Sequence, residues 1–226
     1  MTDSKPKALQ KLKKGTLNRA LIVAAAIHIA DDLGVERVTM RAVATSVGVE
    51  AMSLYNHVSN RADLLDAMID TVIAEIKLPP ENEEWTQGLR NIAQSTRTVL
   101  RQHSWATGMI DSRSKPGFAT LRHHNQILGM LRRSGFSTTM AIHALAVLDS
   151  YVYGSVLQEN ALQLDHLGDQ KTAAIELLKQ LPVDEYPYLA EVAQERATLG
   201  DSAPNTDDEF NFGLELIVQG LKPDEK

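Results

Sequence analysis

The sequence predicts an all-α fold, on three observations. Apolar residues recur every three or four positions along most of the 226 residues, which is the spacing of one helix face. No sustained stretch alternates polar and apolar residues between turn signals, as the strands of a sheet would. The polar stretch Leu78–Glu84 contains two consecutive prolines, which stop a helix. This stretch divides the chain into an N-terminal domain, residues 1–77, and a C-terminal domain, residues 84–226.

The first two helices have end signals in the sequence. Thr16 can cap a helix that runs to about Leu33, and Gly34 then takes the position after the helix end. Thr39 can cap a second, short helix, which Gly48 ends because glycine tolerates positive φ. Residues 1–15 precede the first helix and form a basic tail.

The third and fourth helices follow Gly48. The third is expected over Glu50–His57, and the fourth begins after Ser59 or Asn60 and runs to about Ile76. If Asn60 is the cap, Asp63 stands where a capping box needs its acid. The second helix, the glycine turn and the third helix have the spacing of a helix-turn-helix motif. With the first helix they make a three-helix domain.

The C-terminal domain is also expected to be helical throughout. Apolar periodicity predicts helices at about 84–103, 117–134, 137–163 and 207–221. The sequence allows further helix at 169–180 and 187–197, and residues 200–208 have the composition of a loop. His123 and His124 are adjacent, so they point to different sides of a helix and are expected to be structural or surface residues.

The helix-turn-helix segment has one apolar face and one unusual outer face. The apolar face is expected to fasten its helices together, through Val43, Val47, Val49, Leu54 and Val58. A solvated helix face normally carries Glu and Lys, whereas the outer face here carries small and hydrogen-bonding side chains. Such a surface suits contact with base edges and phosphates. Its residues are Ala51, Met52, Ser53, Tyr55 and Asn56.

Charge and composition narrow the classes of function. Residues 1–61 hold nine Lys/Arg and five acids, a net +4, whereas the whole chain has a net charge of −6. A basic end on an acidic body fits phosphate binding by that end; alternatively, the tail is only a solvated segment. The chain has no cysteine, which excludes disulfides and thiolate chemistry. No signal peptide or membrane-spanning run is recognised, so a cytoplasmic protein is expected.

The segment "GVERVTMRAVATSVGVEAMSLYNHVSNRADLLDAM" (Gly34–Met68) resembles the tetracycline-repressor (TetR) family of bacterial transcription regulators. The resemblance continues in the C-terminal domain, at "EWTQGLRNIAQSTRTVL" (Glu84–Leu100), "RRSGFS" (Arg132–Ser137) and "FNFGLELIVQGL" (Phe210–Leu221). It implies a repressor that a small-molecule effector releases from a palindromic DNA operator. The implied recognition helix is 50–57, in the major groove. The implied DNA-binding residues are Thr39, Arg41, Ala51, Met52, Ser53, Tyr55, Asn56, His57 and Arg61.

The resemblance also implies a homodimer and an effector pocket. The dimer would be built on helices 137–163 and 207–221, with an apolar stripe of Phe210, Leu214, Ile217, Val218 and Leu221. Alternatively, this stripe only closes the core of one protomer. Two positions that hold the drug's magnesium ion in tetracycline repressors are Ile110 and Gln158 here, so no metal or other cofactor is expected. The aligned pocket positions are Ile92, Thr96, Ile110, Arg113, Gln126, Ile127, Ser150, Tyr151 and Gln158.

Two other classes of function stay open. A helix-turn-helix protein can act as an adaptor without an effector. A small-molecule enzyme is the second alternative, although the sequence contains no glycine-rich phosphate loop, no HExxH and no GxSxG motif. A DNA-binding regulator is expected to bind duplex DNA with an affinity that falls steeply with salt concentration, whereas an adaptor or an enzyme is expected to show no such affinity.

Overall fold

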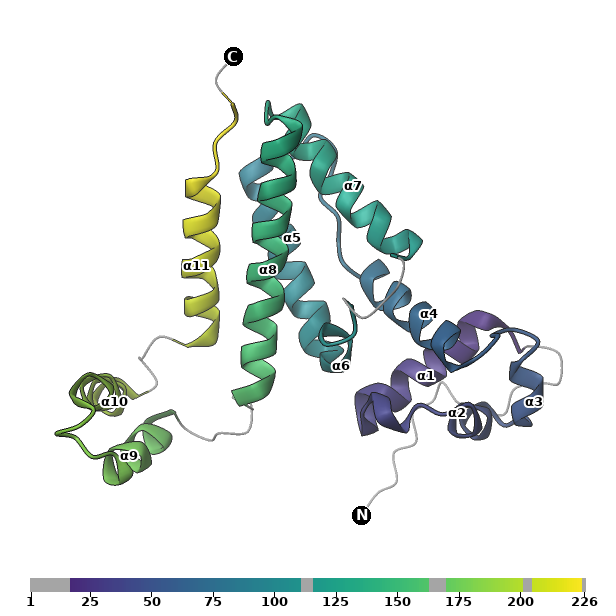
Figure 1. Ribbon diagram of the computed structural model, residues 1–226, viewed down its shortest axis with the longest axis horizontal. Coiled ribbons are helices and arrows are strands. Elements are labelled where there is room, and N and C mark those ends of the chain that lie inside the picture. Colours follow the sequence, from purple (N-terminus) through teal and green to yellow (C-terminus); the bar gives the residue numbers. More distant parts are fainter. Residues whose placement is uncertain (1–16, 111–115, 163–169, 201–204, 225–226) are drawn as a thin grey trace.

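The computed structural model describes residues 17–110, 116–162, 170–200 and 205–224. Within these ranges it consists of helices and contains no strand, which confirms the all-α prediction. Figure 1 shows the N-terminal helices gathered at one end of the molecule and α11 beside α8 near the other. The basic tail, residues 1–15, lies outside the described residues.

Four α-helices and one short 3-10 helix form the N-terminal domain. They are α1 (Arg19–Leu33), η2 (Val35–Arg37), α2 (Met40–Val47), α3 (Ala51–Leu54) and α4 (Arg61–Ala74). The cap of α1 is Asn18, whose side chain accepts a hydrogen bond from the Leu21 N–H. The predicted cap, Thr16, lies outside the described residues, and α1 begins at Arg19, two residues later than predicted. Both residue types occur as helix caps, and asparagine is the more strongly preferred of the two.

Helix α3 is shorter than predicted, since it ends at Leu54 rather than His57. The next backbone N–H groups bond three residues back, with 3.3 Å from Tyr55 N to Met52 O and 2.9 Å from His57 N to Leu54 O. This tighter pattern is usual where a helix ends. The chain then extends to Asn60, which caps α4 by accepting from the Asp63 N–H at 2.9 Å.

Seven helices make up the described part of the C-terminal domain. They are α5 (Trp85–Gln102), α6 (Ser104–Thr107), α7 (Phe118–Arg133), α8 (Thr138–Leu162), α9 (Gln170–Gln180), α10 (Pro187–Leu199) and α11 (Thr206–Gly220). The four helices predicted from apolar periodicity are confirmed to within two residues. The short α6 was not predicted, and α9 and α10 form where the sequence only allowed helix. These two pack on each other and stand apart from the other helices (Figure 1).

Two clusters of buried apolar residues form the core. The first holds the N-terminal helices together and includes Val99, Leu100, Ala106, Ala119 and Val156 from the C-terminal domain. The second joins α5, α7, α8 and α11. Because the first cluster crosses the stretch Leu78–Glu84, the division at residues 77 and 84 stays a prediction about folding units.

The apolar stripe predicted to form the dimer lies largely inside the protomer. Phe210, Leu214 and Val218 are at most 3% exposed and belong to the second cluster. The Tyr151 ring stacks on Phe210 at 5.4 Å between centroids. The assignment of this stripe to an interface between protomers is therefore corrected. The exposed apolar side chains of α11 are Phe212, at 70%, and Leu216, at 58%.

Helix α8 is an exception to the prediction that no segment could span a membrane. By length and composition alone, Thr138–Ala161 is long and apolar enough to span a membrane. In the structure, 28% of its most apolar window is buried. One side packs into the second cluster through Ala144, Leu148 and Val152. The other side exposes Ile142 and Val147. A helix that is apolar all round normally packs on more than one side.

Candidate nucleic-acid interface and effector site

The helix-turn-helix geometry is set by a threonine cap and a left-handed glycine. Thr39 Oγ1 accepts from the Ala42 N–H at 3.1 Å, which starts α2. Gly48 ends the helix with φ 74° and ψ 33°. A residue with a Cβ is strained in this conformation. Thr39 and Gly48 therefore begin and end α2 as the sequence predicted.

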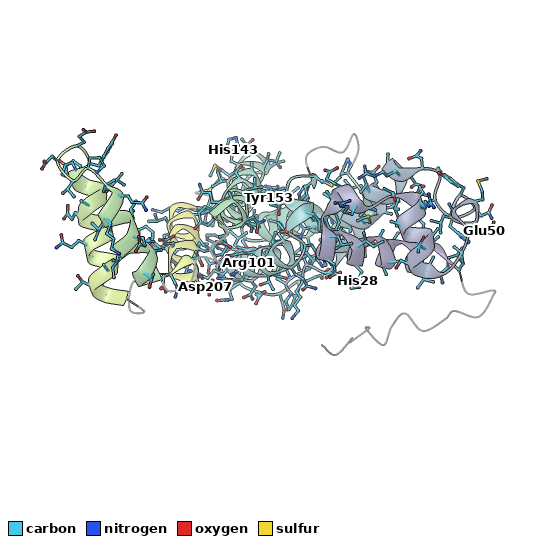
Figure 2. All side chains as sticks on the ribbon, turned by 90° about the horizontal axis from the view of Figure 1, so that it is seen from below. His28, Glu50, Arg101, His143, Tyr153 and Asp207 are labelled. Carbon is cyan, nitrogen blue, oxygen red and sulfur yellow. The ribbon has the colours of Figure 1, made fainter. Side chains whose placement is uncertain are left out.

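Most residues of the inner and outer faces of the motif lie as predicted. Val43, Val47, Leu54 and Val58 are buried in the first cluster. Met52 is 74% exposed and Tyr55 is 46% exposed. Asn56 is exposed and Ser53 is half-buried. Ala51 is half-buried and packs against the first cluster, so only part of it faces outward. His57, also assigned to DNA, is half-buried. Glu50, the residue before α3, lies at the far end of the molecule in Figure 2, so this face is open to a large partner.

The two arginines assigned to DNA have different surroundings. Arg41 is exposed on α2. Arg61, the first residue of α4, donates from Nε to the Val38 carbonyl at 2.7 Å and from Nη2 to the Val35 carbonyl at 3.1 Å. Two of its three nitrogens therefore hold the segment that leads into α2. The remaining terminal nitrogen is the one with which Arg61 would reach a phosphate.

The predicted effector positions are divided among several places. Ile110 and Ser150 line one groove, whereas Tyr151 and Gln158 line a smaller hollow of about 180 Å³. The hydroxyl of Tyr151 donates to the Phe210 carbonyl at 2.8 Å, so it is already used to hold α11. Three other positions, Ile92, Thr96 and Ile127, are buried. Arg113 lies outside the described residues. Gln126 donates to the Pro79 carbonyl at 3.2 Å.

The groove that contains Ile110 and Ser150 lies between the end of α6, the first half of α7 and the middle of α8. Its volume is about 690 Å³, within the usual range for small-molecule sites. Its lining is mainly apolar, with polar groups from Thr120, Tyr153 and the pair His124–Asp149, whose Nε2 and Oδ2 atoms are 3.4 Å apart. Tyr153 lies near the centre of the molecule in Figure 2.

His123 is a buried polar residue that the sequence did not single out as functional. It is 4% exposed, and burial lowers the pKa of His123 to about 4, so its ring is neutral at pH 7. Within the described part of the chain, its Nδ1 has no hydrogen-bond partner, and neither do the hydroxyls of buried Thr96 and Thr107. Such atoms normally have a partner in a folded protein. His123 lies four positions before Ile127, on the same face of α7, and this spacing could have indicated that His123 is buried.

Among the described residues, no group of three or more His, Cys, Asp or Glu side chains could hold a metal ion. The expectation that the protein binds no metal stays a prediction.

Comparison with known proteins gives two family matches. Residues 22–68 match the family described as bacterial regulatory proteins, tetR family. Residues 78–224 match the tetracyclin repressor-like C-terminal domain. The HTH-type transcriptional repressor DrrR1 of Streptomyces coeruleorubidus is 31% identical over 218 residues, which cover 92% of this chain and 78% of that protein.

Two further similarities cover almost the whole chain. The tetracycline repressor protein class G of Vibrio anguillarum is 30% identical over 219 residues, 95% of each chain. The crystal structure of the Streptomyces coelicolor TetR family protein ActR in complex with actinorhodin superposes with a TM-score of 0.73. That match has 27% identity and covers 91% of this chain and 96% of ActR. The chain therefore belongs to the TetR family of bacterial regulatory proteins.

Proposed function

We propose that the protein is a transcription repressor that leaves a palindromic DNA operator when a small molecule binds its C-terminal domain. The observation that carries this proposal is the outer face of the helix-turn-helix, where a glycine turn and a short helix expose Met52, Tyr55 and Asn56. Similarity to a transcription repressor over 92% of the chain supports it. A soluble, cytoplasmic protein without catalytic activity fits this role.

A titration of labelled duplex DNA, followed by fluorescence anisotropy, tests the proposal. A DNA-binding regulator loses affinity steeply as salt rises. Its binding releases counterions from the DNA phosphates, and this release becomes less favourable at higher salt concentration. An adaptor or an enzyme shows no such affinity for a random duplex. An operator for later experiments comes from selection with the wild-type protein on a pool of randomised duplexes.

The DNA contacts are proposed for the nine residues assigned from the sequence. Asn56 is suited to pair with adenine, and Met52 to pack on a thymine methyl group. Replacing Asn56 by alanine should relax specificity at one base step, since a correct base contact is worth roughly 1–3 kcal/mol. Binding of the variant to single-base variants of the selected duplex measures this. If Arg41, Tyr55 and Asn56 can all become alanine with operator affinity unchanged, α3 is not the reading element.

Arg61 is proposed to contact a phosphate through its remaining terminal nitrogen, Nη1, for which the described residues give no bond. The Arg61→Gln variant should bind selected and random duplexes more weakly by similar factors. The slope of log affinity against log salt should fall by about 1, as for the loss of one phosphate contact. A variant that keeps the wild-type slope would show that Arg61 acts only through the Val35 and Val38 carbonyls.

The effector is proposed to be a molecule other than a tetracycline–magnesium complex, bound in the groove between α6, α7 and α8. At the two positions aligned with metal-holding residues, Ile110 has no donor atom and Gln158 lines a different hollow. The complex of ActR with actinorhodin shows that a similar chain accepts another ligand. Calorimetry with tetracycline and Mg²⁺, together and apart, should detect no tight binding. Tight binding that a chelator abolishes would overturn this proposal.

A homodimer is proposed through the outer sides of α8 and α11. Two copies of a small helix-turn-helix double the contacts on a palindromic site. The exposed Phe212 and Leu216 of α11, and Ile142 and Val147 of α8, give a two-fold interface its apolar residues.

A further inference from the structure

The proposed recognition helix, α3, is too short to keep its conformation and orientation without contacts to the rest of the domain. Helix α3 contains four residues, and no side chain caps its N-terminus. An isolated helix of this length is unstable in water, because forming the first turn costs more than one hydrogen bond returns. The direction in which Met52, Tyr55 and Asn56 face the DNA therefore depends on contacts with the rest of the domain. Leu54 and Val58 make apolar contacts in the first cluster, and polar contacts hold the segment that follows α3.

One such contact is made by Arg19, from the first turn of α1. Its Nη1 donates to the backbone carbonyl of His57 at 2.8 Å, three residues beyond the end of α3. Its guanidinium also holds the Asp63 carboxylate of α4 with two bonds, Nη2 to Oδ1 at 2.5 Å and Nη1 to Oδ2 at 3.1 Å. Paired bonds of this kind fix direction as well as distance.

Asp63 completes the contact from the other side. Its Oδ2 accepts from the Ser59 N–H at 2.7 Å, so the carboxylate binds the turn between α3 and α4. A capping box would instead direct this oxygen to the Asn60 N–H. The hydrogen bond from Arg19, and then that from Ser59, lower the pKa of Asp63 to about 2. A carboxyl with a lowered pKa gives stability that is present above its ordinary pKa of 3.8 and lost toward pH 2, so the contact is complete at neutral pH.

We propose that Arg19 and Asp63 are positioning residues for operator reading: together they fix the end of α3 against α1 and α4, and neither contacts DNA. The inference rests on the proposed DNA-binding function. For removal of the Asp63 carboxylate, it predicts a change in operator affinity opposite in sign to the change expected from charge alone. Asp63 is a negative group next to the DNA-binding face, so removing its charge alone should strengthen binding to every duplex. Loss of orientation should weaken binding to the operator.

The test compares Asp63→Asn with wild type on the duplex selected by the wild-type protein and on a random duplex. We expect at least a ten-fold loss of affinity for the selected duplex, on the order of one lost base contact, and less than a two-fold change for the random duplex. Asp66→Asn is the matched control, because it removes the same charge from the same helix one turn further on. It should bind both duplexes at least as tightly as wild type.

Arg19 gives a second, independent measurement. Arg19→Gln should also lose operator affinity at least ten-fold, but its salt slope should equal that of wild type, in contrast to Arg61→Gln. The double variant Arg19→Gln/Asp63→Asn should be no weaker than the weaker single variant, because both act through one contact. Arg19→Lys, which keeps the charge but loses the paired geometry, should lie between wild type and Arg19→Gln.

Three results would overturn the inference. Asp63→Asn could bind the selected duplex as tightly as Asp66→Asn does. Both duplexes could lose affinity in proportion, with a lower melting temperature, which would assign the pair to stability. A fall in the salt slope of Arg19→Gln would make Arg19 a phosphate contact. If the wild-type protein itself binds no duplex in a salt-dependent way, the proposed function fails, whatever these variants do.

Discussion

Replacing Arg97 by alanine should lower the free energy of unfolding by about 3–5 kcal/mol, the usual cost of removing one partner from a buried ion pair. The Arg97 side chain is 5% exposed. It contacts Glu159 of α8 at 2.8 Å and Asp207 of α11 at 2.7 Å, and it lies 4.5 Å above the centre of the Phe210 ring. Alanine would remove this partner from the largely buried Glu159 carboxylate, whose contact with Arg101 is weaker, at 3.6 Å.

Urea unfolding followed by circular dichroism measures this effect, at one protein concentration for all variants. The control is Arg196→Ala, since Arg196 pairs with Glu209 at a similar distance of 2.7 Å but both side chains are exposed. Exposed pairs contribute about 0–1 kcal/mol, so this variant should stay close to wild type. Removing Glu159 as well, in Arg97→Met/Glu159→Leu, should recover part of the loss. An Arg97→Ala variant within about 1 kcal/mol of wild type would contradict the prediction.

The parts of the fold that could be predicted depend on local signals. Thr39 and Gly48 end α2 through contacts with residues four or fewer positions away, so the sequence alone contains the information. The start of α1 was missed because the sequence offers two possible caps, Thr16 and Asn18, and the structure uses Asn18, the better capping residue type. The sequence also placed the end of α3 too late. The segment after this helix is bonded to Arg19, at a sequence separation of 38 residues, and local signals do not reveal such a contact.

The assignment of side chains to sites was less predictable for a related reason. Helix α11 is apolar on two sides, and periodicity cannot tell which side meets the core and which meets a partner. The sequence chose the side of Phe210 and Leu214, which the structure buries against α5 and α8. Resemblance placed Ser150 and Tyr151 in one pocket, although adjacent residues of a helix point in different directions. The structure puts them in different hollows.

Charged residues show the same limit. Arg19 and Arg61 both count toward the positive charge of the N-terminal domain, and charge alone suggests DNA for each. The structure gives Arg19 an internal carboxylate partner, and it gives Arg61 two internal carbonyls. Only three-dimensional contacts separate an arginine that binds phosphate from one that holds the protein together.

Replacing Phe212 by glutamate should convert the proposed dimer into a monomer. Phe212 is 70% exposed in one protomer, on the side of α11 that faces away from the second cluster. A two-fold interface contains each residue twice, and burying one such side chain is worth about 1.5–3 kcal/mol. The substitution should therefore weaken dimerisation by about 3–6 kcal/mol, which is roughly a hundred-fold to ten-thousand-fold in the dissociation constant.

Sedimentation equilibrium at micromolar concentration should show a dimer for the wild-type protein and a monomer for Phe212→Glu. Leu33→Glu is the control, because Leu33 is a similarly exposed apolar residue, at 68%, but lies at the end of α1. This control should stay dimeric. The monomer should bind the selected operator much more weakly than the dimer, because each copy then reads only half of a palindromic site. A wild-type protein that sediments as a monomer would remove the dimer proposal, and a dimeric Phe212→Glu variant would place the interface on another surface.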